Sequence, residues 1–129
     1  MRLLSVAEVE DIHRRVVAQS GGSGGVRDAG VLHSCLSQPL QTFDGQELYV
    51  GVVEKAAALG FFLTANHPFV DANKRVAHAV VEVTLRLNGY RINASVDEQE
   101  SVMLSLASGN LTRRQFAEWV EQHVQRVGA

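Results

Sequence analysis

Apolar residues recur at three- and four-residue spacing along most of the chain, the period of helices that bury one face. The first such stretch begins with Ser5 and Glu8, whose spacing is that of a capping box at a helix amino terminus. The same signature recurs at two later points, Ser95 with Glu98 and Thr112 with Gln115. The pattern predicts six helices, over residues 5–19, 28–38, 49–66, 72–88, 97–107 and 113–126.

The segments 49–66 and 72–88 are predicted to be the central pair. The first is apolar around most of its circumference, which is normal for a helix enclosed by others. Pro68 biases His67 away from helical backbone, so a loop should separate the two segments. Asn88-Gly89 is a typical left-handed helix stop. We therefore expect an all-α fold, a compact six-helix bundle with a candidate active-site loop between the two central helices.

Several segments interrupt the helical pattern. The glycine-rich run 21–25 must break the first helix, because glycine costs about 1 kcal/mol inside a helix. Residues 38–47 are rich in turn formers and leave room for a small extended flap at Thr42-Phe43, while 90–94 should be a short extended link. There is no repeat or periodic strand pattern, so we interpret residues 1–129 as a single domain.

Composition narrows the class of protein. With 46% hydrophobic and 20% charged residues, the 129-residue chain is typical of globular proteins. The net charge of −2 argues against nucleic-acid binding, which usually needs a basic stripe. No stretch approaches the length of a membrane span and no signal-peptide core is present, so we expect a cytoplasmic protein. The single cysteine, Cys35, is expected to be a small buried apolar residue.

Candidate chemistry is concentrated in the run His67-Pro68-Phe69-Val70-Asp71-Ala72-Asn73-Lys74-Arg75, at a predicted helix start. Lys74 and Arg75 are unfavourable in a first turn, because the helix dipole favours acids there. If Asp71 is the N-cap, these two cations and the free amides of the first turn would together attract an anion. A bound phosphate would remove the conflict.

Each of these groups has a chemical role in such a site. His67 is the candidate general base, because histidine changes protonation near pH 7. Asp71 is placed to help hold Mg²⁺, which takes few protein carboxylates. Lys74 and Arg75 should neutralise phosphate charge, while the first-turn amides, from Ala72 on, point at the anion.

Structural explanations compete with these roles. Asn73 could donate to the anion or stabilise the turn, and Phe69 is expected to plug into the core and fix the loop. Asp71 could be a simple cap, and the Lys74-Arg75 pair could be solvated surface. From the residues alone, phosphoryl transfer, nucleotidyl transfer and hydrolysis all remain open.

The run from His67 to Arg75 resembles the Doc branch of the Fic/Doc family, whose pattern is His-x-Phe-x-(Asp/Asn)-(Ala/Gly)-Asn-Lys-Arg. It matches at every fixed position. The surroundings agree as well, over roughly residues 3–126. They comprise the glycine-rich run with Val26-Arg27-Asp28 after it, Lys55-Ala56-Ala57, Asn66 and Leu87-Asn88-Gly89.

The larger Fic branch transfers adenylyl groups from ATP, and its pattern is similar to His-Pro-Phe-x-(Asp/Glu)-Gly-Asn-Gly-Arg-x-x-Arg. This chain departs from it at Ala72, Lys74 and His78. A lysine in place of the second glycine fills part of the anion hole, so ATP is not expected to bind there in the same way. His78 either lines the same pocket or packs between helices. The loop 38–47 lies where relatives carry a flap that aligns the target by strand addition.

The resemblance to the Doc branch implies the toxin of a toxin–antitoxin pair. Its activity would be that of a protein Ser/Thr kinase, a phosphotransferase that uses ATP and Mg²⁺ and arrests translation and growth by phosphorylating elongation factor Tu. Its antitoxin would carry a disordered tail that folds to a helix in a groove over the active site. The implied site comprises His67 as the catalytic base, Asp71 as the metal ligand, and Ala72, Asn73, Lys74, Arg75 and His78 around the nucleotide. Two alternatives stay open, a Fic-type adenylyltransferase and a non-catalytic helical binding module.

Overall fold

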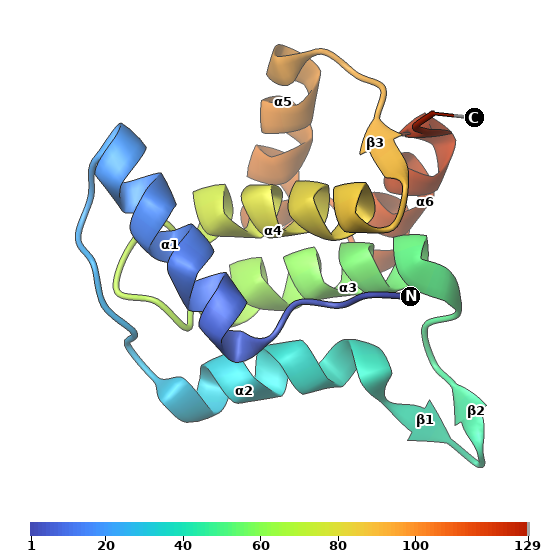
Figure 1. Ribbon diagram of the computed structural model, residues 1–129, viewed down its shortest axis with the longest axis horizontal. Helices are drawn as coiled ribbons and strands as arrows, with labels where there is room; N and C mark the ends of the chain where they lie inside the picture. The colour runs from blue at the N-terminus through green and yellow to red at the C-terminus, as the bar shows by residue number, and fades with distance from the viewer. Residues whose placement is uncertain (129) are drawn as a thin grey trace.

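The computed structural model describes residues 1–128, which are mostly helical (Figure 1). The α-helices of this range are α1 (Val6–Ser20), α2 (Ala29–Ser37), α3 (Gly51–Asn66), α4 (Asn73–Leu87), α5 (Val96–Ala107) and α6 (Arg113–His123). The remaining elements are the short 3-10 helix η1 (Gln38–Leu40) and the strands β1 (Thr42–Phe43), β2 (Gln46–Glu47), β3 (Tyr90–Ile92) and β4 (Val124–Arg126). The predicted all-α class with six helices is confirmed.

Helices α3 and α4 form the centre of the molecule and lie side by side in opposite directions (Figure 1). The sequence permits this close packing because α3 is rich in small and apolar residues. A Cβ atom added to Gly60 would lie 2.5 Å from Cγ2 of Val81 and 3.4 Å from the Phe116 ring. Any side chain at position 60 would therefore push α3 away from α4 and α6.

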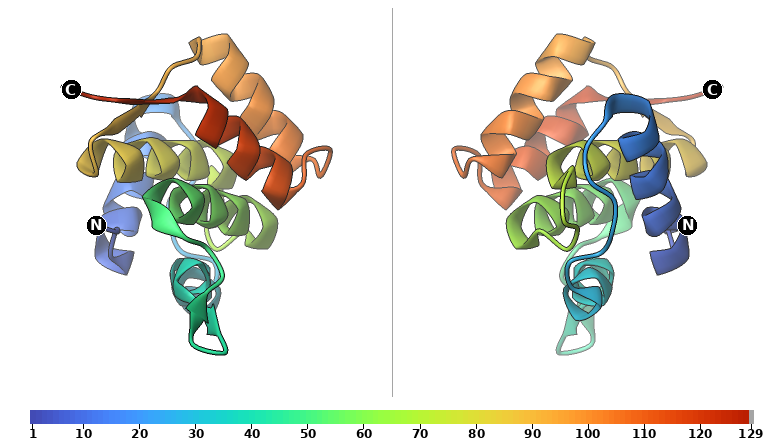
Figure 2. Two further views of the ribbon diagram at one scale, coloured as in Figure 1. Left: turned by 90° about the vertical axis from the view of Figure 1, so that its right-hand side faces the viewer. Right: turned by 90° about the vertical axis from the view of Figure 1, so that its left-hand side faces the viewer.

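The other helices cover this pair on several sides (Figure 2). Helix α1 packs mainly on α4. Helices α2 and α6 pack on α3, and α5 contacts both central helices. Every helix contributes buried apolar side chains to one core, among them Val9, Leu32, Leu63, Val80, Met103 and Phe116. The buried stripe predicted for 72–88 was Val76, Ala79, Val80, Val83 and Leu87, and only Val76 and Val80 of these are fully buried. Leu87 is exposed, and the buried face of α4 runs through Val81 and Leu85 instead.

Four helices begin at the polar residues that the sequence indicates. At each of these N-caps, a side-chain oxygen accepts a hydrogen bond from an amide in the first turn of the helix. The capping residues are Ser5, Asp28, Ser95 and Thr112. The capping boxes at α1 and α6 are complete. The box predicted at α5 is only half formed, because the Glu98 carboxylate lies 3.3 Å from Nε2 of His123 instead.

The expected flap is a two-stranded hairpin in which β1 pairs with β2. Asp44 and Gly45 form its turn with positive φ, as short hairpin turns require. The buried Lys55 ammonium lies 2.9 Å from the Glu47 carboxylate and so ties the hairpin to the first half of α3. The loop that begins at His67 follows the other end of α3 (Figure 1), about 24 Å along a 16-residue helix. The structure does not bring the hairpin to that loop.

The predicted final helix, 113–126, is wrong at its end. Helix α6 stops at His123, and residues 124–126 form β4, antiparallel to β3. The amide of Asn93 also donates to the carbonyl of His123 at 2.7 Å. The extended link predicted at 90–94 exposes unpaired backbone groups, and pairing with the end of the chain satisfies both segments.

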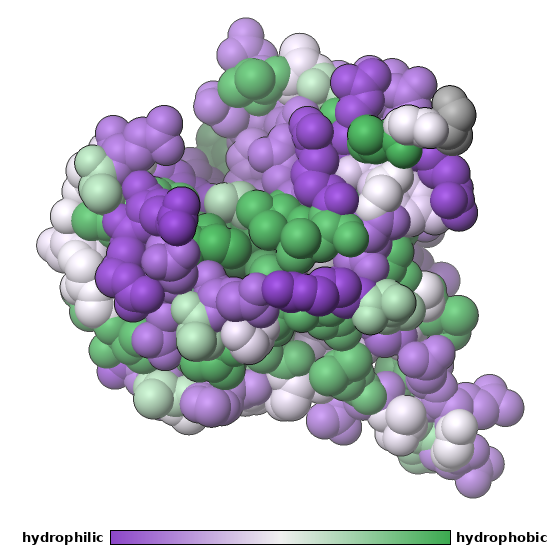
Figure 3. Space-filling model, viewed as in Figure 1, coloured by the Kyte–Doolittle hydropathy of each residue, from purple (hydrophilic) through white to green (hydrophobic). Residues whose placement is uncertain are grey.

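Hydrophobic side chains also gather on the surface, in a groove between α1 and α4 (Figure 3). The groove has a volume of about 450 Å³. Its apolar lining consists of Leu4, Ala7, Ile12, Val83 and Leu87, and charged residues of α1 stand along its edge. A surface of this kind can accept an apolar helix face.

Two expectations from composition can be compared with the fold. Cys35 is buried as predicted, and burial raises the pKa of its thiol to about 11. Its S–H donates to the carbonyl of Phe62 at 3.3 Å, so the thiol belongs to the core. Among residues 1–128, no helix combines the length and the apolar character needed to cross a bilayer.

Candidate active site

The segment between α3 and α4 turns sharply at both ends. His67 adopts left-handed backbone with φ 48° and ψ 60°, and Ala72 does so with φ 66° and ψ 20°. Neither is a glycine, so each position carries about 1 kcal/mol or more of backbone strain. Pro68 and Phe69 are buried between these turns, whereas the His67 side chain is exposed. The loop therefore presents an imidazole to solvent from an anchored backbone.

Phe69 is the anchor of this loop, as predicted. Its ring is 1% exposed and stacks on the buried His13 ring, with centroids 4.1 Å apart and planes 7° from parallel. His13 also reaches the loop through Nε2, which lies 3.0 Å from the carbonyl oxygen of Asp71. Nothing in the sequence pattern distinguished His13 from the other inward residues of its helix. Its contact with the loop is a feature that sequence reasoning missed.

Asn73 holds the loop from the α4 side. Its Oδ1 accepts from the amide of Phe69 at 3.0 Å, and its Nδ2 donates to the carbonyl of Phe69 at 3.0 Å. The two-sided amide thus closes the turn around Phe69. This is the turn-stabilising role, one of the two roles that the sequence left open for Asn73.

Asp71 is not the N-cap of α4, which corrects the sequence prediction. The N-cap is Ala72, and no side chain caps the helix. The Asp71 carboxylate instead accepts from the amide of Ala72 at 2.7 Å and from the amide of Ser23 at 3.0 Å. The hydrogen bond from Ser23, then that from Ala72 and the charge of Arg75, lower the pKa of Asp71. The carboxylate is therefore ionised at neutral pH and lies beside the helix start.

The start of α4 leaves three amides free. The N–H groups of Asn73, Lys74 and Arg75 make no hydrogen bond within residues 1–128, and Val76 is the first to donate inside the helix. The amide of Ala72, which the sequence assigned to the anion, is already bonded to Asp71. Free first-turn amides at the positive end of a helix are a favourable environment for an anion.

Five predicted side chains share one open hollow of about 390 Å³ at this helix start, lined by His67, Asp71, Asn73, Lys74 and Arg75 with Val70 and Ala72. Lys74 is exposed and has no ion-pair partner within the described chain. Arg75 is held on one side by the hydroxyl of Ser20, 2.5 Å from its Nη1, and by the carbonyl of Gly21 at 2.9 Å. A base, an ionised carboxylate and two cations thus surround the free amides.

His78 packs between helices, one of the two roles considered for it, and does not line the hollow that contains His67. Its Nε2 lies 2.9 Å from Oε1 of Gln99 and so joins α4 to α5. It also lines a second hollow, of about 300 Å³, together with Glu100 and Met103. Lys74 and Arg75 line both hollows, so the two spaces adjoin across these cations.

The segment 20–28, here called the glycine segment, is the largest feature that sequence reasoning missed. It binds Arg75 through Ser20 and Gly21, and Asp71 through Ser23. A Cβ atom on Gly22, whose φ is +115°, would lie 2.7 Å from the Asp71 carboxylate and 2.9 Å from the Arg75 guanidinium. The carbonyl of Gly25 accepts from the amide of Val70 at 3.1 Å, and Val26 forms a β-bridge with Phe69. The composition of this segment indicated only a break after the first helix, because its contacts lie about fifty positions away along the chain.

Comparison of the sequence with known proteins shows which family the chain resembles. A model of the Fic/DOC family matches residues 3–85, a range that holds α1 to α3, the loop and most of α4. The chain is also 39% identical over 90 residues to the "Toxin Doc" of Mycolicibacterium smegmatis (strain ATCC 700084 / mc(2)155), covering 68% of this chain and 69% of that protein. The chain belongs to the Fic/Doc family.

Membership in the Fic/Doc family confirms the resemblance drawn from the run His67 to Arg75. Members of the family are typically transferases that use a nucleoside triphosphate with a metal ion. The matched range contains both the glycine segment and the loop. Helices α5 and α6 lie beyond the matched residues.

Proposed function

We propose that this Fic/Doc protein is a Mg-ATP-dependent protein Ser/Thr kinase. The observation that carries the proposal is the hollow at the start of α4, where an exposed imidazole, an ionised carboxylate and two cations surround three free amides. Phosphoryl transfer needs mainly positioning and charge stabilisation, and these groups supply both.

His67 is proposed as the general base. Its imidazole is exposed beside the hollow, so a target hydroxyl can reach it and lose its proton. The amides of Asn73, Lys74 and Arg75, with the two cationic side chains, would hold the phosphates and stabilise the charge of the transition state. His78 would line the adjoining space, where the rest of the nucleotide can lie.

Asp71 is proposed as the protein ligand of Mg²⁺. Its carboxylate is ionised, and each oxygen accepts one backbone hydrogen bond, which leaves lone pairs for a metal. No cluster of three or more potential ligands occurs among residues 1–128, so Asp71 would act alone with water and phosphate oxygens. Such a site suits Mg²⁺, which commonly takes one or two carboxylates beside substrate phosphates. Bound Mg²⁺ would neutralise charge on the transferred phosphoryl group.

Phosphoryl transfer is preferred to adenylyl transfer because of two positions in the loop. Where the Fic pattern has glycines, this chain has Ala72, whose backbone is left-handed, and Lys74, whose side chain reaches the hollow. The lysine occupies space and adds charge where the Fic pattern leaves an open anion hole. A nucleotide bound across Lys74 would present its terminal phosphate to His67.

The biological role that we propose is that of a toxin in a toxin–antitoxin pair, acting in the cytoplasm. The relative named Toxin Doc supports this role. The proposed target is a threonine or serine of elongation factor Tu, whose phosphorylation would stop translation. The proposed antitoxin carries a disordered tail that folds to a helix, and the groove between α1 and α4 offers apolar surface for it.

The activity is tested by the mass of the product. Purified protein is incubated with ATP, Mg²⁺ and elongation factor Tu, and the target is weighed by mass spectrometry. We expect the addition of one phosphoryl group, and its loss with His67→Ala. His33→Ala is the matched control, because His33 is an exposed histidine of α2 outside the hollow. A mass increase of one adenylyl group would favour the Fic-type activity instead. If no covalent product forms, the proposed kinase activity is contradicted.

The toxin role is tested separately in cells. Expression of the chain should arrest growth, and a small protein encoded next to it should relieve the arrest. His67→Ala should be harmless if catalysis is the basis of the effect. Equal toxicity of the wild type and His67→Ala would instead support a non-catalytic binding module.

A further inference from the structure

The carboxyl end of α3 cannot be closed by its own backbone. The last carbonyls of a helix lack internal partners, and a left-handed residue followed by a free N–H usually satisfies them. Here the left-handed residue is His67, and the residue after it is Pro68, which has no N–H to donate. The donors must come from elsewhere in the molecule.

Arg27 of the glycine segment supplies the donor for the last carbonyl of α3, that of Asn66, and also bonds the two carbonyls that follow the helix. Its Nε donates to the carbonyl of His67 at 2.6 Å, and its Nη2 donates to the carbonyl of Asn66 at 2.9 Å. Its backbone amide donates to the carbonyl of Pro68 at 2.8 Å. One residue therefore bonds three successive carbonyls, and its positive charge meets the negative end of the helix dipole.

We propose that Arg27 is a positioning residue that fixes the His67 imidazole over the hollow. Left-handed backbone at a residue other than glycine is unfavourable, so His67 keeps it only while its surroundings enforce it. The guanidinium fork acts on the carbonyl of His67 itself, whereas His13 and Asn73 hold the later part of the loop. Loss of the fork would let the backbone of His67 relax and move its side chain. The start of α4 would stay in place. The kinetic part of this inference rests on the proposed kinase activity.

The variants are Arg27→Met, which keeps the aliphatic stem without the charge, and Arg27→Lys, which keeps the charge without the planar fork. Arg15→Met is the matched control, because Arg15 is an exposed arginine whose ion pair with Asp11 lies on the surface of α1. Steady-state kinetics of each variant give kcat and the KM for ATP. The expected result for Arg27→Met is a kcat about 30- to 100-fold lower, as for a base displaced by about 1 Å, with the KM for ATP nearly unchanged. Arg27→Lys should recover part of the loss, and Arg15→Met should match the wild type.

A second measurement follows the imidazole directly. The chain has five histidines, so the ring resonances of His67 in an NMR spectrum are identified by their loss in His67→Ala. Both Arg27 variants should shift the His67 resonances and leave those of His33 unchanged. In Arg15→Met, the His67 resonances should stay at their wild-type positions. Should Arg27→Met fail to fold, the charge-conserving Arg27→Lys provides the same readout.

Three results would overturn the inference. They are unchanged His67 resonances in a folded Arg27 variant, a rise in the KM for ATP with kcat unchanged, and an activity loss that only follows the loss of folded protein. If the wild type transfers no phosphoryl group, the proposed function fails. The resonances of His67 still decide the role of Arg27 in that case, so the two failures are distinguishable.

Discussion

Helices α4 and α6 begin with similar charges and very different backbones. Each has two cations in its first turn, Lys74 and Arg75 in α4, Arg113 and Arg114 in α6. Both pairs oppose the helix dipole. A cation pair at a helix start is therefore no sufficient sign of an anion site in this protein.

The two helix starts differ in how their amides are satisfied. In α6, Thr112 and Gln115 form a complete capping box, with hydrogen bonds of 2.9 and 3.1 Å. In α4, the N-cap is Ala72 and three amides stay free. Within residues 1–128, the capping box of α6 bonds the amide of Gln115 and leaves those of Arg113 and Arg114 free, so the start of α4 offers one more free donor to a ligand.

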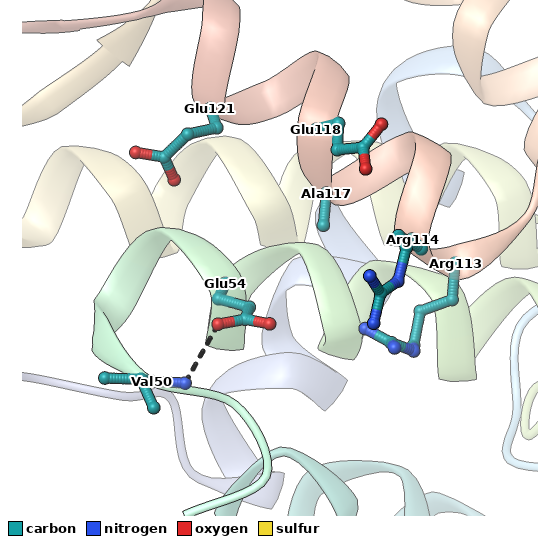
Figure 4. A pocket seen from close by; sticks show the side chains of 7 residues that line it. All are labelled: Val50, Glu54, Arg113, Arg114, Ala117, Glu118 and Glu121. Carbon is teal, nitrogen blue, oxygen red and sulfur yellow. Dashed lines mark hydrogen bonds between the residues drawn. The ribbon is translucent and has the colours of Figure 1, made fainter.

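The surroundings of the two cation pairs differ in the same direction. Figure 4 shows the guanidinium groups of Arg113 and Arg114 near each other in a hollow that is also lined by three carboxylates, those of Glu54, Glu118 and Glu121. The hollow at α4 has a single carboxylate, Asp71, which is already bonded to two amides. The positive charge of α6 thus has three carboxylates around it, whereas that of α4 has Asp71 in its own hollow and Glu100 in the adjoining one. The anion site proposed at α4 therefore depends on its free amides combined with its cations.

The largest effect is expected from the carboxylate of the α4 hollow. Asp71→Asn should lower phosphoryl transfer by about 10²- to 10³-fold, because it removes the charge proposed to hold Mg²⁺. Glu118→Gln makes the matching change in the α6 hollow and should leave the rate unchanged. Steady-state rates at several Mg²⁺ concentrations measure both. Equal rates for Asp71→Asn and the wild type would contradict the proposed role of Asp71 as the Mg²⁺ ligand.

The next largest difference between the two helix starts is expected in ATP binding when one cation is removed from each pair. Lys74→Met should weaken ATP binding about 10- to 100-fold, since a hydrogen bond to a charged group contributes about 1.5 to 3 kcal/mol. Arg114→Met should leave ATP binding unaltered. Titration calorimetry at low and high salt measures both variants. A similar loss of affinity in both would mean that the charge of the whole molecule, and not the α4 start, attracts the nucleotide.

Smaller effects are expected on the stability of the fold, where a change at the start of α6 should destabilise the protein and a change at the start of α4 should stabilise it. Thr112→Ala should lower the free energy of unfolding by about 1 kcal/mol, because it leaves a capped amide without its partner. Ala72→Gly should raise it by about 0.5 kcal/mol, because glycine tolerates left-handed backbone without strain. Urea unfolding gives both values. Destabilisation by Ala72→Gly would show that its methyl group matters more than its backbone.

The smallest effect concerns pH and a third helix start, that of α1. There Glu8 completes the capping box with Ser5 and pairs with Arg2 at 2.6 Å. The hydrogen bond from Arg2, followed by that from the amide of Ser5, lowers the pKa of Glu8 to about 2. Because the folded pKa lies below the unfolded one, the stabilisation is complete above about pH 4.5 and is lost as the pH falls toward 2.

Glu8→Gln tests this dependence. It should flatten the decrease of unfolding free energy between pH 5 and 2 slightly, while Glu121→Gln, at an exposed carboxylate of α6, should not. Urea unfolding across this pH range measures both. An unchanged acid slope for Glu8→Gln would contradict the ion pair seen at the start of α1.

Local signals allowed much of this fold to be predicted. The caps at Ser5, Asp28 and Thr112 depend on residues three positions apart, so the sequence alone indicates them. The burial of Phe69 was likewise predictable, because a lone aromatic residue in a polar loop usually enters the core. The run from His67 to Arg75 also indicates where the hollow lies, because its charged residues adjoin a predicted helix start.

The errors share a physical cause, which is competition from partners distant in the sequence. Asp71 has the side chain of an N-cap, but its carboxylate bonds the amide of Ser23 and that of its neighbour Ala72. The residues after His123 continue an apolar pattern, yet they pair with β3. Local propensity cannot foresee either outcome, because the competing partner is brought close only by the folded chain.

The glycine segment has the composition of a flexible spacer, and that appearance is misleading. Gly22 lies so close to the Asp71 and Arg75 side chains that no larger residue fits there without displacing them. An artificial tether of equal length would leave the carboxylate and the imidazole without the hydrogen bonds that Ser23 and Arg27 supply. The stretch that looks most replaceable is thus the one where protein engineers have the least freedom.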